Sequence, residues 1–201
     1  WEKYITKKTK CIFLESPSNP TMEIIDIQSV SKIAHDHNAL VIVDNILASP
    51  VLQKPLDLGA DIVVYSGTKH IDGQGRSMGG AVLSSSEFRE EYLKPFIRHT
   101  GPTLSPFNAW ILLKGLETLK YRMNQHCYNA LKIAKYFNNH KQVLKTIYPG
   151  LKNHRQFELA QKQMLQAGSI ITIVIKGGKE KAFDFINRLR VFDISNNLGD
   201  T

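Results

Sequence analysis

The sequence has 201 residues, of which 42% are hydrophobic and 22% are charged, and its formal net charge is +8. This length and apolar fraction suit a globular protein with one large domain, or with one and a half. The lysines and arginines are dispersed in short groups without interleaved aromatic residues, a pattern that argues against nucleic-acid binding.

The sequence contains no segment typical of a membrane or secreted protein. No apolar run reaches the roughly 20 residues of a membrane-spanning helix, and the N-terminus lacks the apolar core of a secretory signal. Cys11 and Cys127 form no Cys-x-x-Cys pair and the histidines lack zinc spacing, so we expect reduced thiols and no metal. These features predict a cytoplasmic protein. Because the first residue is Trp1 rather than methionine and the last few residues end without a tail, we interpret the chain as part of a longer protein.

The first part of the chain predicts strands that alternate with helices. Three short apolar runs are typical of strands, at residues 10–15, 39–43 and 60–65. Between the first two, Asp26 is placed to cap a helix that runs to about Asn38. The second run shows no alternation with polar residues, which predicts a strand buried on both faces. Strands separated by helical connections indicate a parallel sheet with right-handed crossovers.

The second part predicts a long helix and a different kind of domain. Ser105 is a suitable N-cap and Pro106 fits the first helical position of a pattern that continues towards Phe137. A strand is expected at residues 168–175 and a helix around residues 180–189. We therefore expect two units, which are part of a large domain (residues 1–125) and the start of a smaller α+β C-terminal domain (residues 126–201).

Two residues of opposite charge are expected at one edge of the sheet. Asp44 and Lys69 each follow a predicted strand, and ligands of open parallel sheets lie beyond the carboxyl ends of the strands. A lysine, a carboxylate and the nearby hydroxyls of Ser66 and Thr68 suit a site for pyridoxal 5'-phosphate. In such a site the lysine forms a Schiff base, the carboxylate keeps the ring nitrogen protonated, and the hydroxyls bind phosphate.

Other interpretations of these residues remain open on spacing alone. Lys69 and Asp72 could form a surface ion pair while Asp44 caps a helix, and the spacing by itself favours this interpretation. The sequence before Lys69 lacks the upstream glycine of a P-loop, and residues 73–79 have one residue too many for the dinucleotide fingerprint. The glycines of this segment are expected either to turn close to a ligand or to form a flexible loop.

Four segments in order resemble a known family over essentially the whole chain. Residues 15–21, 43–45, 66–70 and 113–123 are similar to the signatures of the Cys/Met-metabolism pyridoxal-phosphate-dependent enzymes. The resemblance implies the aspartate-aminotransferase-like (fold type I) α/β architecture. This fold has a three-layer large domain with a mainly parallel sheet, followed here by part of the α+β C-terminal domain.

The resemblance also implies roles for single residues. Lys69 would carry the cofactor and move protons, and Asp44 would pair with the pyridine nitrogen. Ser66 and Thr68 would bind the phosphate, and Asn19 would lie near the ring and the substrate carboxylate. No metal is implied.

Two positions depart from the common family pattern. Gly67 stands where alanine is usual, and Ile46 stands where threonine is frequent. We expect both to be tolerated, because Gly67 adds freedom and Ile46 lies beside the ion-pair position rather than in it.

Within the family, residues 72–76 and 101–110 are most similar to the O-succinylhomoserine sulfhydrylases. That resemblance implies γ-replacement on an acylated homoserine, in which O-succinylhomoserine and sulfide give homocysteine and succinate. Cystathionine γ-synthase and γ-lyase activities are the alternatives within the family. Family members act as homodimers or homotetramers, with sulfide or cysteine as the second substrate.

Several parts of the family's site have no counterpart in residues 1–201. These are a tyrosine and an arginine that reach the neighbouring subunit's cofactor, a glycine-rich phosphate loop, and a C-terminal arginine that binds the substrate carboxylate. We therefore expect the isolated chain to lack turnover. The alternative from another class is an inactive fragment that at most binds a partner chain.

Overall fold

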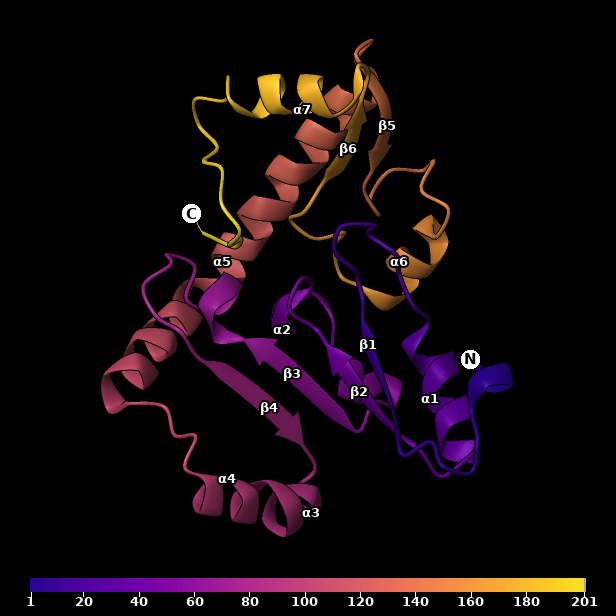
Figure 1. The fold of residues 1–201 in the computed structure, drawn as a ribbon, viewed down its shortest axis with the longest axis vertical. Helices are drawn as coiled ribbons and strands as arrows, with labels where there is room; N and C mark the ends of the chain where they lie inside the picture. The colour runs from indigo at the N-terminus through magenta and orange to yellow at the C-terminus, as the bar shows by residue number, and fades with distance from the viewer. Residues whose placement is uncertain (201) are drawn as a thin grey trace.

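The computed structural model describes residues 1–200; Thr201, the last residue of the predicted second domain, lies outside the described residues. A 3₁₀ turn, η1 (Glu2–Tyr4), precedes a sheet of four strands in the order β1-β2-β3-β4 (Figure 1). The strands are β1 (Cys11–Glu15), β2 (Leu40–Asp44), β3 (Ile62–Ser66) and β4 (Gly80–Ser84). The first three are parallel, as predicted, and β4 pairs antiparallel with β3.

Helices cover one face of this sheet. Helix α1 (Ile27–Asp36) begins after Asp26, whose side chain accepts a hydrogen bond from the Ser29 N–H (2.9 Å), as its position in the sequence predicted. The short helices α2 (Ser49–Leu52) and η2 (Pro55–Leu58) connect β2 to β3. The inner face of α1 and alternate strand residues form a buried cluster that includes Ile12, Leu14, Ile27, Val30, Ala34, Val41 and Val43.

The opposite face of the sheet is open within residues 1–200. Phe13 and Val82 are 60% and 50% exposed, and Leu40 is 38% exposed, whereas Val41 and Val43 are buried. The expectation that residues 39–43 are buried on both faces is therefore wrong for this chain. Successive side chains of a strand point to opposite faces, so only alternate residues reach the helical layer.

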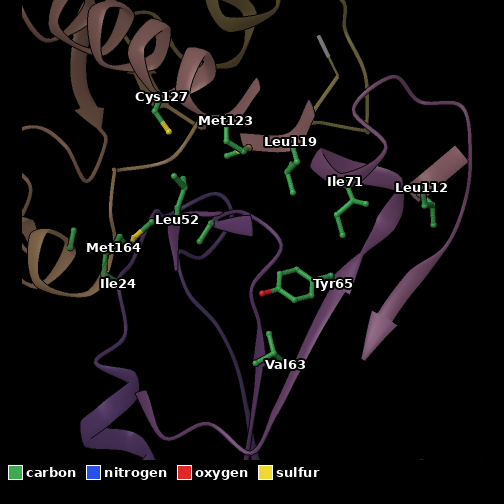
Figure 2. Close-up of a cluster of buried hydrophobic side chains, with 12 residues drawn as sticks. Ile24, Leu52, Val63, Tyr65, Ile71, Leu112, Leu119, Met123, Cys127 and Met164 are labelled. Atoms are coloured by element: carbon green, nitrogen blue, oxygen red, sulfur yellow. The ribbon is translucent and has the colours of Figure 1, made fainter. Parts of the chain in front are cut away.

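A single long helix, α5 (Pro106–Asn138), joins the two parts of the molecule. Ser105 caps it by accepting a hydrogen bond from the Asn108 N–H (3.1 Å), as predicted. The helix is continuous through residue 125, where the sequence suggests a division between domains. Figure 2 shows its buried face against the four-stranded sheet, in a cluster that includes Val63, Tyr65, Ile71, Leu112, Leu119, Met123 and Cys127.

Beyond α5 lies a smaller unit with a two-stranded antiparallel sheet. Its strands are β5 (Val143–Ile147) and β6 (Thr172–Ile175), and its helices are α6 (Phe157–Gln163) and α7 (Gly178–Ile186). The predicted strand and helix of this region are both present, although each is shorter than expected. The segment after α7 runs back along α5 towards the four-stranded sheet (Figure 1).

Three further elements follow β4. They are α3 (Ser86–Phe88), η4 (Arg89–Leu93) and α4 (Lys94–Thr100), and none of their residues is buried. Across residues 1–200, no helix has both the length and the apolar character needed to cross a membrane. Neither cysteine is in a disulfide in the described residues; Cys11 is exposed and Cys127 is buried.

Candidate cofactor site

The carboxyl edge of the four-stranded sheet brings polar side chains together on its open face. Asp44, the last residue of β2, is in register with Glu15 of β1 and Val64 of β3. Register partners in a sheet point to the same face, and so does Ser66, which lies two residues beyond Val64. The structure therefore places Glu15, Asp44 and Ser66 on one face, the face that residues 1–200 leave open.

Two carboxylates in this group carry perturbed acidities. Burial raises the pKa of Asp44, although its Oδ1 accepts a hydrogen bond from the Ile46 N–H (3.1 Å) that opposes the shift. Burial also raises the pKa of Glu15; the Asn19 N–H lowers it, and the charge of Asp44 raises it further. Among the described residues neither carboxylate forms a salt bridge. The pair is therefore an acidic site that favours a positively charged group.

Lys69 lies directly after β3 in a single turn of helix, η3 (Gly67–Ile71). Its backbone has φ −88° and ψ −126°, which is neither helical nor extended. The Nζ amine donates a hydrogen bond to Asn197 Oδ1 (2.5 Å). Gly199 lies against the backbone of the Lys69 turn, where a Cβ on this glycine would be 2.7 Å from the His70 backbone nitrogen. The C-terminal segment therefore reaches the lysine.

The surface pair between Lys69 and Asp72 that spacing alone favoured does not form. Asp72 is only 1% exposed, and its Oδ1 lies 2.8 Å from Arg76 Nη2 in a salt bridge. Asp72 also accepts hydrogen bonds from the backbone N–H groups of Arg76 and Ser77. Asp44 does not cap a helix either, because α2 begins only at Ser49, after the N-cap Ala48.

The other predicted residues surround the same strand ends. Thr68 Oγ1 accepts a hydrogen bond from the N–H of Gly79 (3.3 Å), the residue immediately before β4. Asn19 is exposed, and its backbone N–H donates to Glu15 Oε2 (3.1 Å), next to Asp44 in the sheet. Gly67 is buried, and a Cβ there would lie 3.0 Å from Leu112 Cδ1. The freedom expected of this glycine is thus limited by packing against α5.

Sequence reasoning missed the contact of Asn197 with Lys69. The two residues are 128 positions apart, and no motif links them. The local signal in the sequence is the glycine at position 199, which suggests a turn. In the structure Gly199 has φ +95°, a conformation that a residue without a side chain adopts easily. Local patterns do not reveal which distant strand end such a turn will approach.

The residues present fit pyridoxal phosphate. They include a primary amine at the end of a strand, a half-buried carboxylate without a cation partner at the end of the neighbouring strand, and two hydroxyls beside the amine. Asp44 has no cationic partner among the described residues, and a protonated pyridine ring would be such a partner. No group of side chains that could hold a metal ion occurs in the described part of the chain.

The whole chain matches a family of known proteins. Residues 1–201 match the family described as Cys/Met metabolism PLP-dependent enzyme. The chain is 47% identical to the O-succinylhomoserine sulfhydrylase of Pseudomonas aeruginosa and 45% identical to that of Mycobacterium tuberculosis, in both cases over 100% of this chain. It is 43% identical to an L-methionine gamma-lyase of Treponema denticola over 99% of this chain. The chain spans about half the length of each of these relatives, 50% in all three cases.

Solved structures agree with the predicted fold. A crystal structure of metB from Corynebacterium glutamicum matches with a TM-score of 0.97 at 40% identity, over 99% of this chain and 52% of that one. Cystathionine gamma synthase from Xanthomonas oryzae pv. oryzae, in complex with aminoacrylate and cysteine, matches with a TM-score of 0.92 at 38% identity, over 95% of this chain and 49% of that one. These matches confirm the fold type I α/β architecture, and the chain belongs to the Cys/Met-metabolism family of pyridoxal-phosphate-dependent enzymes.

Proposed function

We propose that the edge of the sheet that carries Asp44 and Lys69 is this chain's part of a pyridoxal-phosphate site. Lys69 is the residue that attaches the cofactor, and Asp44 is the partner of its pyridine nitrogen. Ser66 and Thr68 bind its phosphate, and Asn19 lies beside the ring. The observation that carries the proposal is the placement of an unpaired half-buried carboxylate and a lysine at adjacent strand ends.

When bound, the cofactor supplies an electron sink for the charge that develops at the substrate's α-carbon. Lys69 Nζ is then the base that removes the α-proton and returns protons in later steps. Asp44 keeps a proton on the ring nitrogen by presenting its negative charge there. Asn197 holds the amine of Lys69 when the amine is not attached to the cofactor, because its Oδ1 accepts the Nζ hydrogen bond.

The reaction that we propose is γ-replacement on an acylated homoserine, with O-succinylhomoserine and sulfide as substrates. The support is the identity of 45% and 47% to two O-succinylhomoserine sulfhydrylases, against 43% to an L-methionine gamma-lyase. γ-Elimination and cystathionine γ-synthesis are the alternative reactions for this site. An assay with sulfide, with cysteine and without any acceptor, run on a protein in which this chain is extended to the full length of the relatives, separates the three, because only a lyase needs no acceptor.

The cofactor assignment is tested by titrating the chain with pyridoxal phosphate. We expect a visible absorbance band in the wild type that is absent in Lys69→Ala, and a borohydride-stable label on Lys69 found by peptide mapping. Lys54→Ala, in the loop between α2 and η2, is the matched control and keeps the band. Equal spectra for wild type and Lys69→Ala would show that another residue attaches the cofactor.

The second candidate is a chain that binds a partner and has no turnover alone. The open apolar face with Phe13 and Val82 favours it, because exposed apolar surface of this kind marks interaction sites. We expect residues 1–201 alone to give no turnover with O-succinylhomoserine and sulfide. Turnover at the rate of the Pseudomonas aeruginosa relative, assayed in parallel, would contradict this expectation.

A further inference from the structure

The turn that carries Lys69 leaves two backbone carbonyls for another element to bind. Within the turn, the Asp72 N–H donates to the Gly67 carbonyl (2.9 Å) and the Gly73 N–H donates to the Lys69 carbonyl (2.8 Å). The carbonyls of His70 and Ile71, the two residues that follow Lys69, instead accept hydrogen bonds from α5. Figure 2 shows Ile71 in the cluster beneath this helix.

Arg122 on α5 is the donor to both carbonyls. Its Nη1 donates to the His70 carbonyl (2.7 Å), and its Nη2 donates to the Ile71 carbonyl (3.1 Å). Nη2 also donates to the Gly115 carbonyl (2.8 Å), and Nε donates to Thr118 Oγ1 (3.0 Å). The guanidinium is planar and rigid, and its bonds to Thr118 and Gly115 hold it against α5. The two bonds to the turn therefore fix the turn in distance and in orientation relative to this helix.

Two glycines leave the space that this arrangement needs. A Cβ at Gly115 would lie 2.1 Å from the Ile71 carbonyl oxygen, so α5 approaches the turn more closely than any side chain permits. A Cβ at Gly73 would lie 2.2 Å from Arg122 Nη1. The glycine after Asp72 therefore makes room for the arginine, and its φ of +67° fits the turn expected of this segment.

We propose that Arg122 is a positioning residue for Lys69. By binding the carbonyls of the next two residues, it holds the backbone of Lys69 at φ −88° and ψ −126°, a conformation that the turn alone does not favour. This backbone conformation directs the amine to Asn197 Oδ1. The inference rests on the proposed attachment of the cofactor to Lys69, and Arg122 acts only through that lysine.

The test compares Arg122→Gln, Arg122→Lys and the control Lys120→Gln, which removes a positive charge from an exposed site on the same helix. Two quantities are measured in the purified chain. The first is amide hydrogen exchange of residues 67–73, which needs no cofactor. The second is the rate at which pyridoxal phosphate and borohydride label Lys69, followed by mass spectrometry.

We expect labelling of Lys69 to slow by about tenfold or more in Arg122→Gln, because a small displacement of a reacting group is costly in rate. The labelling rate of Arg122→Lys should lie between those of the wild type and Arg122→Gln, since an ammonium group cannot bind three carbonyls in a fixed fork. Amide exchange of residues 67–73 should become faster in both variants, while amide exchange within α5 should be unchanged. Lys120→Gln should match the wild type in both measurements.

The outcomes separate the two proposals. Wild-type exchange and wild-type labelling in Arg122→Lys would overturn the positioning role, whether or not Arg122→Gln folds. If neither Arg122 variant folds while Lys120→Gln does, Arg122 holds the whole chain together and the positioning role is again overturned. Failure of the wild type to label at Lys69 would contradict the proposed cofactor attachment, and the exchange data would still decide whether Arg122 orders the turn.

Discussion

At the scale of single residues, the site combines charged groups that lower the stability of the folded chain. Glu15 and Asp44 are neighbouring carboxylates, and burial raises the pKa of both. Their ionised forms are therefore less favoured in the folded chain than in the unfolded chain. Groups of this kind are kept where function needs them, and they lower stability until a counter-charge arrives.

Asp44→Asn should stabilise the chain and weaken its binding of the cofactor. Because the pKa of Asp44 is raised on folding, the ionised carboxylate lowers stability progressively as the pH rises from about 4 towards 7. Asparagine can still accept the Ile46 N–H bond but carries no charge. The variant should therefore be more stable than the wild type at pH 7, and the difference should vanish near pH 3, where the carboxyl is protonated in the folded and in the unfolded chain.

Urea unfolding at pH 7 and at pH 3 measures this difference. The control is Asp193→Asn, in the exposed segment after α7, which should change stability at neither pH. Pyridoxal-phosphate titration of Asp44→Asn at pH 7 should show affinity lower by about tenfold or more, because the ring nitrogen loses its charged partner. A variant that is less stable than the wild type at pH 7 would contradict the assignment of Asp44 as an unpaired, desolvated carboxylate.

At the scale of elements, the contact between α5 and the Lys69 turn depends on the absence of a side chain at Gly115. Gly115→Ala places a Cβ 2.1 Å from a backbone carbonyl that cannot rotate away. Alanine favours the helix by about 1 kcal/mol, but separating the helix from the turn costs about 1–3 kcal/mol in overpacking and disturbs the Arg122 bonds. The net effect should be a loss of stability.

Thermal unfolding and hydrogen exchange measure the effect of Gly115→Ala. The matched control is Glu117→Ala, two residues further along α5, which removes only a surface pair with Lys114. That pair should contribute less than about 0.5 kcal/mol. Increased stability of Gly115→Ala would show that α5 and the turn are not held in the contact described above.

The elements differ in how far the sequence reveals them. The three parallel strands and α5 were predictable because their signals are local, in the form of apolar runs and the capping pair Ser105 and Pro106. Strand β4 was not, because its residues 80–84 follow a run of glycines and lie exposed at the sheet edge. Strand β5 depends on its pairing with β6, about 30 residues later. Asp44 and Lys69 could be placed at strand ends from local patterns, whereas the Arg122 and Asn197 contacts depend on tertiary packing.

At the scale of the whole molecule, the open face of the sheet should govern the chain's behaviour in solution. Phe13 and Leu14 are adjacent in β1, but Phe13 is 60% exposed and Leu14 is 4% exposed. Phe13→Ser should leave the free energy of unfolding within about 0.5 kcal/mol of the wild type, because little apolar area is lost from the core. It should also raise solubility, since exposed apolar patches promote association.

Leu14→Ser is the matched control for Phe13→Ser. It removes a buried side chain and places a hydroxyl in the core, so it should cost several kcal/mol and unfold the chain at moderate temperature. Light scattering at increasing protein concentration and urea unfolding distinguish the two variants. Equal destabilisation by both substitutions would mean that the face carrying Phe13 is covered in solution.

The return of the C-terminal segment to Lys69 has a consequence for how the molecule folds. The Lys69–Asn197 hydrogen bond joins positions 128 residues apart. Closing so long a loop costs conformational entropy, and this cost is offset only once the intervening chain is already ordered. We expect the sheet and α5 to form first and the lysine to acquire its neighbour last. In refolding experiments the near-native helical signal should therefore precede protection of the lysine amine, and the reactive centre becomes a marker for the final step of folding.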